Sequence, residues 1–250
     1  MKSIRNTLRL TACGIFGLAI TSTASADFSL VQDSGEPNHF DILEGIYSPG
    51  TPWTTFGSRT DGEGDLVDLT NGTLSAVRVD DYGVEGIMNI STGNPGDADD
   101  RLWTGSLIDS HARARFAGYQ QQFGMGFEAG EWIDVLNLFT VSGSGLAVSG
   151  SATMSLAEPT DWVWVRGGDG DQYTSEPFFN GDQDDHMVTY QIRGFDDGLT
   201  HWVLFWEDLP NLGDVDYNDL VVEIAGPAVP EPASMGLMSL GMLALLKRRA

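Results

Sequence analysis

The acidic segment between residues 207 and 219 is the part of the sequence whose residue types and spacing could do chemistry. It opens with Glu-Asp after one apolar run and closes with Asp-x-Asp-x-Asn-Asp before the next. So many ionised carboxylates would repel one another unless a counter-ion lay between them. Calcium accepts about six to eight oxygen ligands and suits a flexible loop. The segment therefore predicts a calcium site formed by Glu207, Asp208, Asp214, Asp216, Asn218 and Asp219.

A second acidic group precedes the apolar run of residues 187–193. It consists of Asp182, Asp184, Asp185 and His186. We expect Asp182 and Asp185 to converge on the same calcium site, because both groups stand next to strands.

The acidic segment admits two other interpretations. Asp214 to Asn218 imitates the start of an EF-hand loop, but Asp219 replaces the sixth-position glycine and Ala225 replaces the twelfth-position glutamate, which excludes an EF-hand. The other interpretation is an acidic hairpin without metal, in which Asp and Asn side chains cap backbone amides in turns.

The elements that must position these residues are predicted to be β-strands. Glycine is frequent, and the apolar runs are short and rich in Val, Ile, Leu and aromatic residues. This pattern predicts an all-β fold, a single β-sandwich or jelly-roll-like domain over residues 27–226. Residues 27–64 are expected to form loops and a few edge strands. The predicted strands cover residues 73–79, 84–90, 112–119, 132–141, 146–156, 161–165, 187–193, 201–206 and 220–224.

The sequence lacks the motifs of common catalytic sites. It has no Gly-x-Ser-x-Gly elbow, His-Glu-x-x-His helix, phosphate-binding loop or dinucleotide fingerprint. We therefore expect a protein that is not an enzyme. Trp162 and Trp164 alternate onto one face of a predicted strand and could form an exposed platform for sugar rings. Two alternatives thus stay open, a carbohydrate-binding module and an extracellular glycoside hydrolase, because two carboxylates suffice for hydrolysis.

The N-terminus predicts export. A basic leader, an apolar stretch and Ala24-Ser25-Ala26 indicate a signal peptide over residues 1–26. Its Cys13 is the single cysteine of the chain, so the mature protein has neither disulfides nor thiolate metal ligands. A lipoprotein lipobox ending at Cys13 is the alternative, but its apolar stretch would have to precede the box.

The charge of the chain is strongly negative, −23 from 36 acidic and 13 basic residues. Six of the bases and one acid lie in the two removable ends, which leaves 35 acids against seven arginines. Nucleic acids and anionic membranes bind basic surfaces, so neither is expected as a partner of the domain.

The C-terminal segment, residues 227–250, carries Pro230-Glu231-Pro232, then a twelve-residue apolar run and Lys247-Arg248-Arg249. It resembles the PEP-CTERM sorting signal. The resemblance implies recognition by an exosortase, export through the inner membrane of a Gram-negative bacterium, and association with extracellular polysaccharide. A helix of twelve residues spans about 18 Å, short of the roughly 30 Å hydrocarbon core, so we expect transient membrane contact, with a permanent anchor as the alternative.

Residues 178–224 resemble a second family, the domain of unknown function 4114. The resemblance rests on Trp206-Glu207-Asp208 and on the run from Asp214 to Val221. Members of that family have no established enzymatic activity. The match implies a secreted, non-catalytic protein of the cell surface or extracellular matrix.

Overall fold

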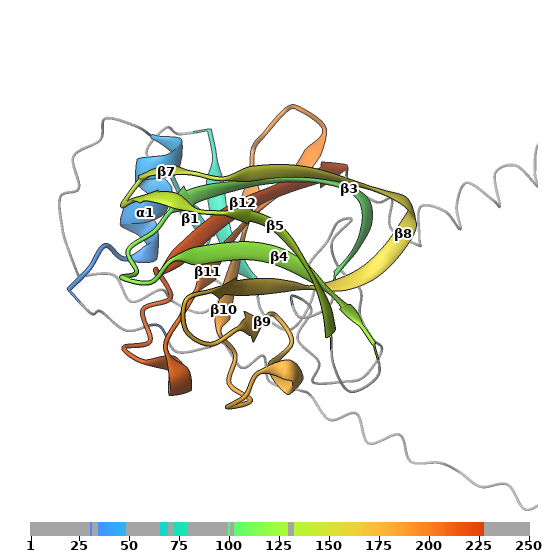
Figure 1. Ribbon diagram of the computed structural model, residues 1–250. Coiled ribbons are helices and arrows are strands. Elements are labelled where there is room, and N and C mark those ends of the chain that lie inside the picture. Colours follow the sequence, from blue (N-terminus) through green and yellow to red (C-terminus); the bar gives the residue numbers. More distant parts are fainter. Residues whose placement is uncertain are drawn as a thin grey trace, which may run out of the picture.

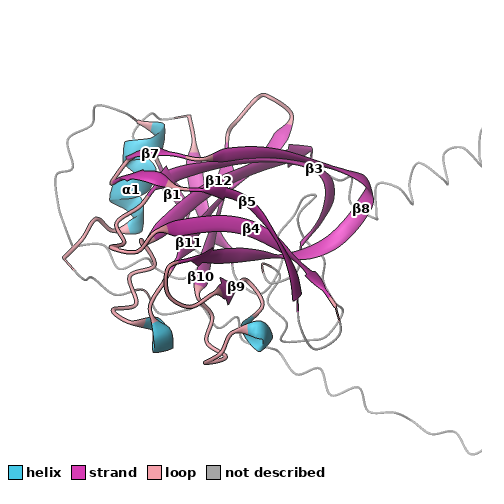
Figure 2. Ribbon diagram, viewed as in Figure 1, coloured by secondary structure: helices cyan, strands magenta, loops and turns pink. Residues whose placement is uncertain are grey.

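The computed structural model describes residues 31, 35–48, 66–69, 73–79, 100, 103–129 and 133–227. Strands dominate these ranges, so the prediction of an all-β fold is confirmed (Figure 2). The helices described are α1 (His39–Tyr47) and two short 3-10 turns, η1 (Pro177–Phe179) and η2 (Pro210–Leu212). The predicted signal peptide, the strand at 84–90 and the sorting segment from residue 228 onward lie outside the described residues.

Ten strands form one antiparallel sheet (Figure 1). In spatial order its main path runs β1 (Leu66–Asp68), β2 (Ser75–Val79), β10 (Met187–Arg193), β11 (Leu199–Trp206), β12 (Leu220–Pro227), β3 (Trp103–Ala114), β8 (Ser151–Gly168), β4 (Gln121–Glu128) and β5 (Ile133–Thr140). The tenth strand, β9 (Tyr173–Thr174), pairs with β8, while β6 (Ser142–Ser144) and β7 (Ala147–Ser149) form a separate hairpin.

Strand β8 gives the sheet its shape. Its first part pairs with β3, from Ser151 to Trp162, and its last part pairs with β4, from Val163 to Gly168. The strand therefore curves out of one portion of the sheet and into the other (Figure 1). The prediction of two strands, at 146–156 and 161–165, was wrong in this respect, because one bent strand of 18 residues covers most of both.

The main core contains residues of both portions of the sheet. Trp103 of β3 packs edge-to-face against Trp202 of β11 and Trp164 of β8, with ring centroids 5.7 and 6.0 Å apart. Phe123 of β4 stacks on Trp164 at 4.9 Å. Large aromatic rings bury much apolar surface at such contacts, and they hold the curved sheet together.

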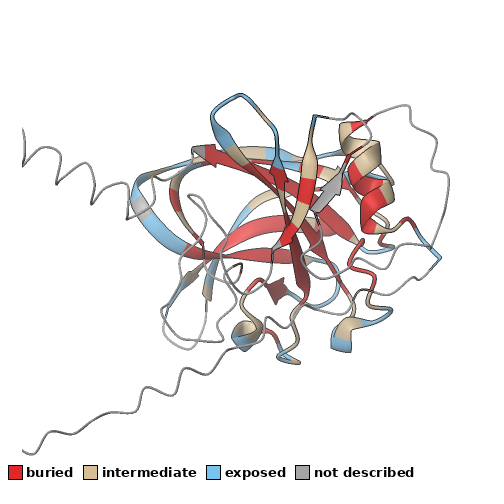
Figure 3. Cartoon of the chain, turned by 180° about the vertical axis from the view of Figure 1, so that it is seen from behind, coloured by how far each residue is buried: buried red, intermediate tan, exposed pale blue. Residues whose placement is uncertain are grey.

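A second core lies on the other face of the sheet, beneath α1 (Figure 3). On β11, Trp202, Leu204 and Trp206 enter the main core, whereas Val203 and Phe205 contact the second. Burial on both faces explains why this strand is a continuous apolar run instead of an alternating one. The prediction of loops and edge strands for residues 27–64 was wrong at α1. The helix has nine residues, which is too short for a clear helical period in the sequence.

Two other strand predictions differ from the structure. The strand predicted at 112–119 is wrong in its bounds, since β3 ends at Ala114. Strand β4 was not predicted, because Gly124 and Gly126 interrupt its apolar pattern. A Cβ at Gly126 would lie 2.9 Å from side-chain atoms of Ile133 and Val163, so close packing explains that glycine. The strands predicted near β2, β5, β10, β11 and β12 are confirmed.

Within the described ranges, the helices are too short to cross a bilayer. The apolar run expected to contact the membrane, residues 235–246, lies beyond them.

Candidate metal centre

The acidic segment is the connection between β11 and β12, two neighbouring antiparallel strands. Trp206, the last residue of β11, pairs with Leu220, the first of β12. The two ends of the segment are therefore held together. The backbone N–H of Asp208 donates to Oδ2 of Asp219 at 2.8 Å, and the N–H of Asp219 donates to the carbonyl of Trp206 at 3.1 Å.

The backbone of the connection is tightly coiled. Asn211, Leu212, Val215 and Tyr217 all adopt positive φ, between 53° and 63°. Such conformations cost about 1–3 kcal/mol each and persist only where the surroundings impose them. Gly213 lies in the same turn, where an added Cβ would meet Leu209 at 2.5 Å and Oε1 of Glu207 at 3.0 Å.

The coiled loop gathers the predicted ligands into two groups that share one residue. Glu207, Asp214 and Asp216 form the outer group, and Glu207, Asp208 and Asp219 form the inner group. Within each group the three carboxylate oxygens lie within 4.8 Å of one another. Calcium binds oxygens at about 2.3–2.6 Å, so two ligands of one ion lie at most about 5 Å apart. The structure thus brings these five carboxylates together at a spacing that a calcium ion could bridge, and their role as calcium ligands stays a prediction.

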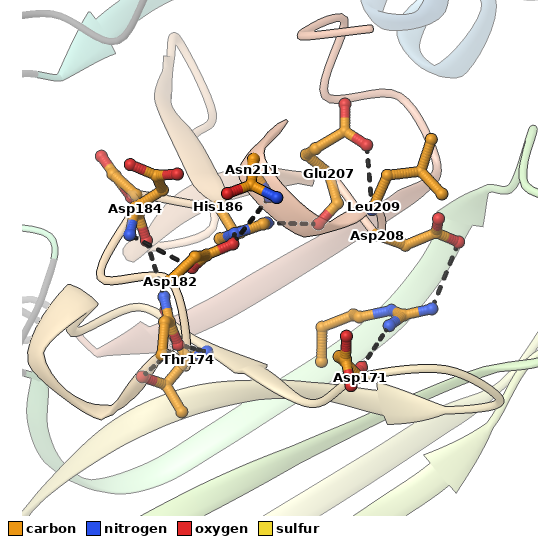
Figure 4. Close-up of polar contacts among 12 residues, drawn as sticks. Asp171, Thr174, Asp182, Asp184, His186, Glu207, Asp208, Leu209 and Asn211 are labelled. Atoms are coloured by element: carbon orange, nitrogen blue, oxygen red, sulfur yellow. Dashed lines mark hydrogen bonds and ion pairs between the residues drawn. The ribbon is translucent and has the colours of Figure 1, made fainter. Parts of the chain in front are cut away.

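The shared residue is buried and only partly satisfied. The side chain of Glu207 is fully buried, and its Oε1 accepts a hydrogen bond from the Leu209 N–H at 3.0 Å (Figure 4). With the neighbouring carboxyls ionised, no described group donates to its Oε2. Asn218 shows the same feature, since its buried Oδ1 has no hydrogen-bond partner among the described residues. Buried polar atoms are normally hydrogen-bonded, and a bound cation is one way to satisfy the two oxygens that this loop leaves without a donor.

Burial and the close spacing of these carboxylates raise pKa values in the loop. Burial raises the pKa of Glu207, and the charges of Asp214 and Asp216 raise it further. Burial likewise raises the pKa of Asp219, with the charges of Asp208 and Glu207 adding to the effect. Without a cation, part of this cluster therefore holds protons at neutral pH.

In the part of the chain that the structure describes, Arg166 is the basic side chain that pairs with this cluster. Its Nη2 lies 3.2 Å from Oδ2 of Asp208, and both side chains are buried. Gln121 fixes the pair, because its Oε1 accepts from Nε of Arg166 at 2.6 Å and its side-chain amide donates to Asp208. Sequence reasoning did not find Arg166 or Gln121, which lie far from the loop in the chain. A lone arginine ending the apolar run of β8 was the available signal.

Two family models match the chain. Residues 228–250 match the PEP-CTERM protein-sorting motif, and residues 146–226 match the domain of unknown function DUF4114. The chain carries a PEP-CTERM sorting motif. Such a motif is recognised by an exosortase and indicates an exported protein of the cell envelope or the surroundings of a Gram-negative bacterium. No curated protein matches the chain.

Both resemblances predicted from the sequence are thus confirmed. The DUF4114 match is wider than expected and takes in β8, the acidic loop and β12. Pro230, Glu231 and Pro232 fall within the PEP-CTERM match, outside the residues that the structure describes.

The second acidic group of the DUF4114 region braces the loop and belongs to neither carboxylate group. Oδ2 of Asp182 accepts from the Asn211 N–H at 2.8 Å and pairs with Nε2 of His186 at 3.0 Å (Figure 4). Oδ1 of Asp185 accepts from the Met187 N–H at 3.2 Å. The expectation that Asp182 and Asp185 would join the ligand set was therefore wrong, because their oxygens serve their own turns and the neighbouring backbone.

The start of α1 also reaches the loop. Nε2 of His39 donates to the carbonyl of Asp216 at 2.9 Å, and the side-chain amide of Asn218 donates to the carbonyl of Pro37 at 3.2 Å. His39 is itself stacked on Phe205, with ring centroids 4.0 Å apart. The N-terminal segment and the connection between β11 and β12 are thus locked together.

The tryptophan platform expected from the sequence was wrong. Trp162 and Trp164 have no exposed surface and belong to the main core. They do share a face of β8, but that face is turned toward the main core. Trp162 is also one of the residues around a pocket of about 340 Å³ that Glu128, Glu176 and Phe178 line, but it exposes no surface there.

Proposed function

We propose that this exported protein is a non-catalytic component of the cell surface or extracellular matrix, stabilised by calcium bound in the loop of residues 207–219 and associated with secreted polysaccharide. The observation that carries the calcium proposal is the buried Glu207, whose Oε2 lies unsatisfied where two groups of carboxylates meet. A metal-free loop would have to leave this oxygen without a donor, at a cost of about 1–3 kcal/mol, or take up a proton on a neighbouring carboxyl such as Asp219.

The donor set favours calcium over other metals. The converging ligand atoms are carboxylate oxygens, which suit hard cations. Magnesium requires near-ideal octahedral geometry, whereas calcium tolerates the irregular arrangement of a coiled loop. An exported protein also meets more calcium than a cytoplasmic one does.

The structural role is supported by where the carboxylates lie. They lie between the end of β11 and the start of β12. A bound cation would connect these two strands, and it would connect both to the start of α1 through the contacts of Asp216 and Asn218. The association with polysaccharide is proposed because PEP-CTERM sorting signals are associated with systems that secrete extracellular polysaccharide.

Thermal unfolding tests the calcium proposal. We expect the melting temperature of the purified protein to rise when millimolar calcium replaces a chelator. A free concentration about 100-fold above the dissociation constant stabilises by about 2.7 kcal/mol. At about 2–4 °C per kcal/mol for a domain of this size, the melting temperature rises by about 5–10 °C. Equal melting temperatures in calcium and chelator would contradict the proposal.

Asp109→Asn supplies the matched control. Asp109 is an exposed carboxylate on β3 that pairs with His111 at 2.9 Å and accepts from Thr153. This variant should respond to calcium as the wild type does, whereas Glu207→Gln should not respond.

The matrix role needs its own test. We expect the purified protein to sediment with polysaccharide secreted by its host and to release no soluble sugar from it. Release of sugar that disappears on replacing a single carboxylate would establish an enzyme instead.

A further inference from the structure

We propose that the loop binds two divalent cations instead of one, with Glu207 as the ligand that they share. This inference rests on the proposed calcium function and adds its stoichiometry and the division of ligands. One cation would lie in the outer group with Asp214 and Asp216, the other in the inner group with Asp208 and Asp219.

Geometry is the first argument. Glu207 is the member common to the two groups, each of which holds its three oxygens within 4.8 Å. A carboxylate has two oxygens and can therefore serve two ions at once. With the neighbouring carboxyls ionised, Oε2 of Glu207 accepts no hydrogen bond from the described groups, and Oε1 accepts one from the Leu209 N–H.

Charge is the second argument. The two groups together contain five carboxylates, and Arg166 supplies one positive charge through its ion pair with Asp208. Four negative charges remain when all five are ionised, which equals the charge of two divalent cations. A single divalent cation would leave two charges uncompensated in a cluster where most of the side chains are buried.

Asn218 provides an independent pointer to a ligand. Its side-chain amide donates to Oδ2 of Asp216 at 2.9 Å and its backbone N–H donates to Oδ1 at 3.2 Å. These bonds orient the Asp216 carboxylate but leave Oδ1 of Asn218, which is 1 % exposed, without a partner among the described residues. An amide oxygen is an ordinary calcium ligand, and this one belongs to the residue that holds a member of the outer group in place.

The number of bound ions decides the matter. Calcium per chain is counted by elemental analysis after gel filtration of the full chain in calcium buffer, and isothermal titration of the chelator-treated protein gives the affinities. We expect two ions in the wild type and one in each of Asp214→Asn and Asp219→Asn. In Glu207→Gln we expect both ions to bind at least about tenfold more weakly, and in the control Asp109→Asn two ions to remain.

The outcomes separate the two claims. A single ion in the wild type overturns the two-cation arrangement and leaves the calcium function standing, whereas no ion overturns both. Loss of every ion in Asp214→Asn and in Asp219→Asn alike would indicate one merged site and also overturn the inference. Near-UV circular dichroism of the buried tryptophans monitors folding, and if Glu207→Gln fails to fold, the wild-type count and the two aspartate variants still decide.

Discussion

Two neighbourhoods of buried carboxylates lie on the same pair of strands, β11 and β12, and differ in the positive side chains that face them. In one, Glu223 of β12 meets His201 of β11 and Arg113 of β3. The His201 Nδ1 lies 3.0 Å from Oε1 of Glu223, and Arg113 Nε lies 2.7 Å from Oε2. In the other, five carboxylates of the connecting loop have Arg166 as the one basic side chain paired with them among the described residues.

The pKa values of the two neighbourhoods move in opposite directions. Burial alone would raise the pKa of Glu223, but the hydrogen bond from His201 and the charge of Arg113 outweigh burial and lower it. In the loop, burial and neighbouring negative charge act together and raise the pKa values of Glu207 and Asp219. The chain therefore supplies its own counter-ions at Glu223, whereas under the calcium proposal the loop would obtain them from solution.

The largest effect is expected where the counter-ions are internal. Replacing Glu223 by Gln leaves His201 and Arg113 without their shared carboxylate, and breaking a buried ion pair in this way costs about 3–5 kcal/mol. We expect the loss in free energy of unfolding, measured by urea titration, to be the same in chelator and in calcium. A loss that calcium reverses would show that the two neighbourhoods are coupled and would break the comparison.

A smaller effect, of changing sign, is expected in the loop. Asp219→Asn removes an ionisable carboxyl whose pKa is raised by burial and by negative neighbours. In chelator the variant should be more stable than the wild type by about 1 kcal/mol, because a neutral amide carries neither the cost of a buried charge nor the cost of protonating it. In saturating calcium it should be less stable, because it loses much of the roughly 2.7 kcal/mol that ligand binding supplies. Urea titrations under both conditions should therefore cross, and parallel shifts would contradict the distinction.

A pH dependence sharpens the comparison further. Burial alone would lower the pKa of His201, but its hydrogen bonds with Glu223 and Asp197 outweigh burial and raise it. The stabilisation that protonated His201 contributes to the folded protein is therefore fully present below the pKa of about 6.5 that it has when unfolded. It is lost as pH rises through the raised pKa of His201 in the folded protein. The contribution of Glu223, whose pKa is lowered, is present above about 4.3 and is lost in acid.

The measurement is the difference in unfolding free energy between the wild type and His201→Gln, taken in chelator. It should be larger at about pH 5.5, inside this window, than at about pH 8.5. A difference that grows toward alkaline pH would mean that His201 is neutral in the folded protein.

The smallest effect is expected at the surface. His111 and Asp109 form an exposed pair on β3, with side chains 48 % and 45 % exposed. Replacing His111 by Ala should change the free energy of unfolding by no more than about 0.5 kcal/mol, with or without calcium, because exposed ion pairs contribute little. A larger change would show that ion pairing alone, without burial, matters in this protein.

The sequence predicted the local parts of the site and missed the parts that depend on distant contacts. Glu207, Asp208 and Asp219 could be predicted because they flank two apolar runs, and antiparallel pairing must bring such flanks together. Arg166 could not be predicted, since it reaches Asp208 only through the curvature of β8. The burial of Trp162 and Trp164 could not be predicted either. Alternation shows that two residues share a face of a strand, but not whether another layer covers that face.

The fold was predictable at the level of strand content but not of connectivity. Strands β10 and β12 were found as apolar runs with turns on either side, whereas β4 was hidden by glycines that exist for packing. Helix α1 was not predicted because it is short and is packed on the sheet through long-range contacts, such as those of His39 with Tyr190 and Phe205.

The place of β12 within the sheet has a mechanical consequence. The strand is interior, with β11 on one side and β3 on the other, and it ends at Pro227, immediately before the sorting motif. A pull transmitted through that motif would act along the strand and shear both ladders at once, so their hydrogen bonds would share the load instead of opening one by one. The other end of β12 continues directly from the acidic loop, so the loop and the sorting motif lie at opposite ends of this one strand.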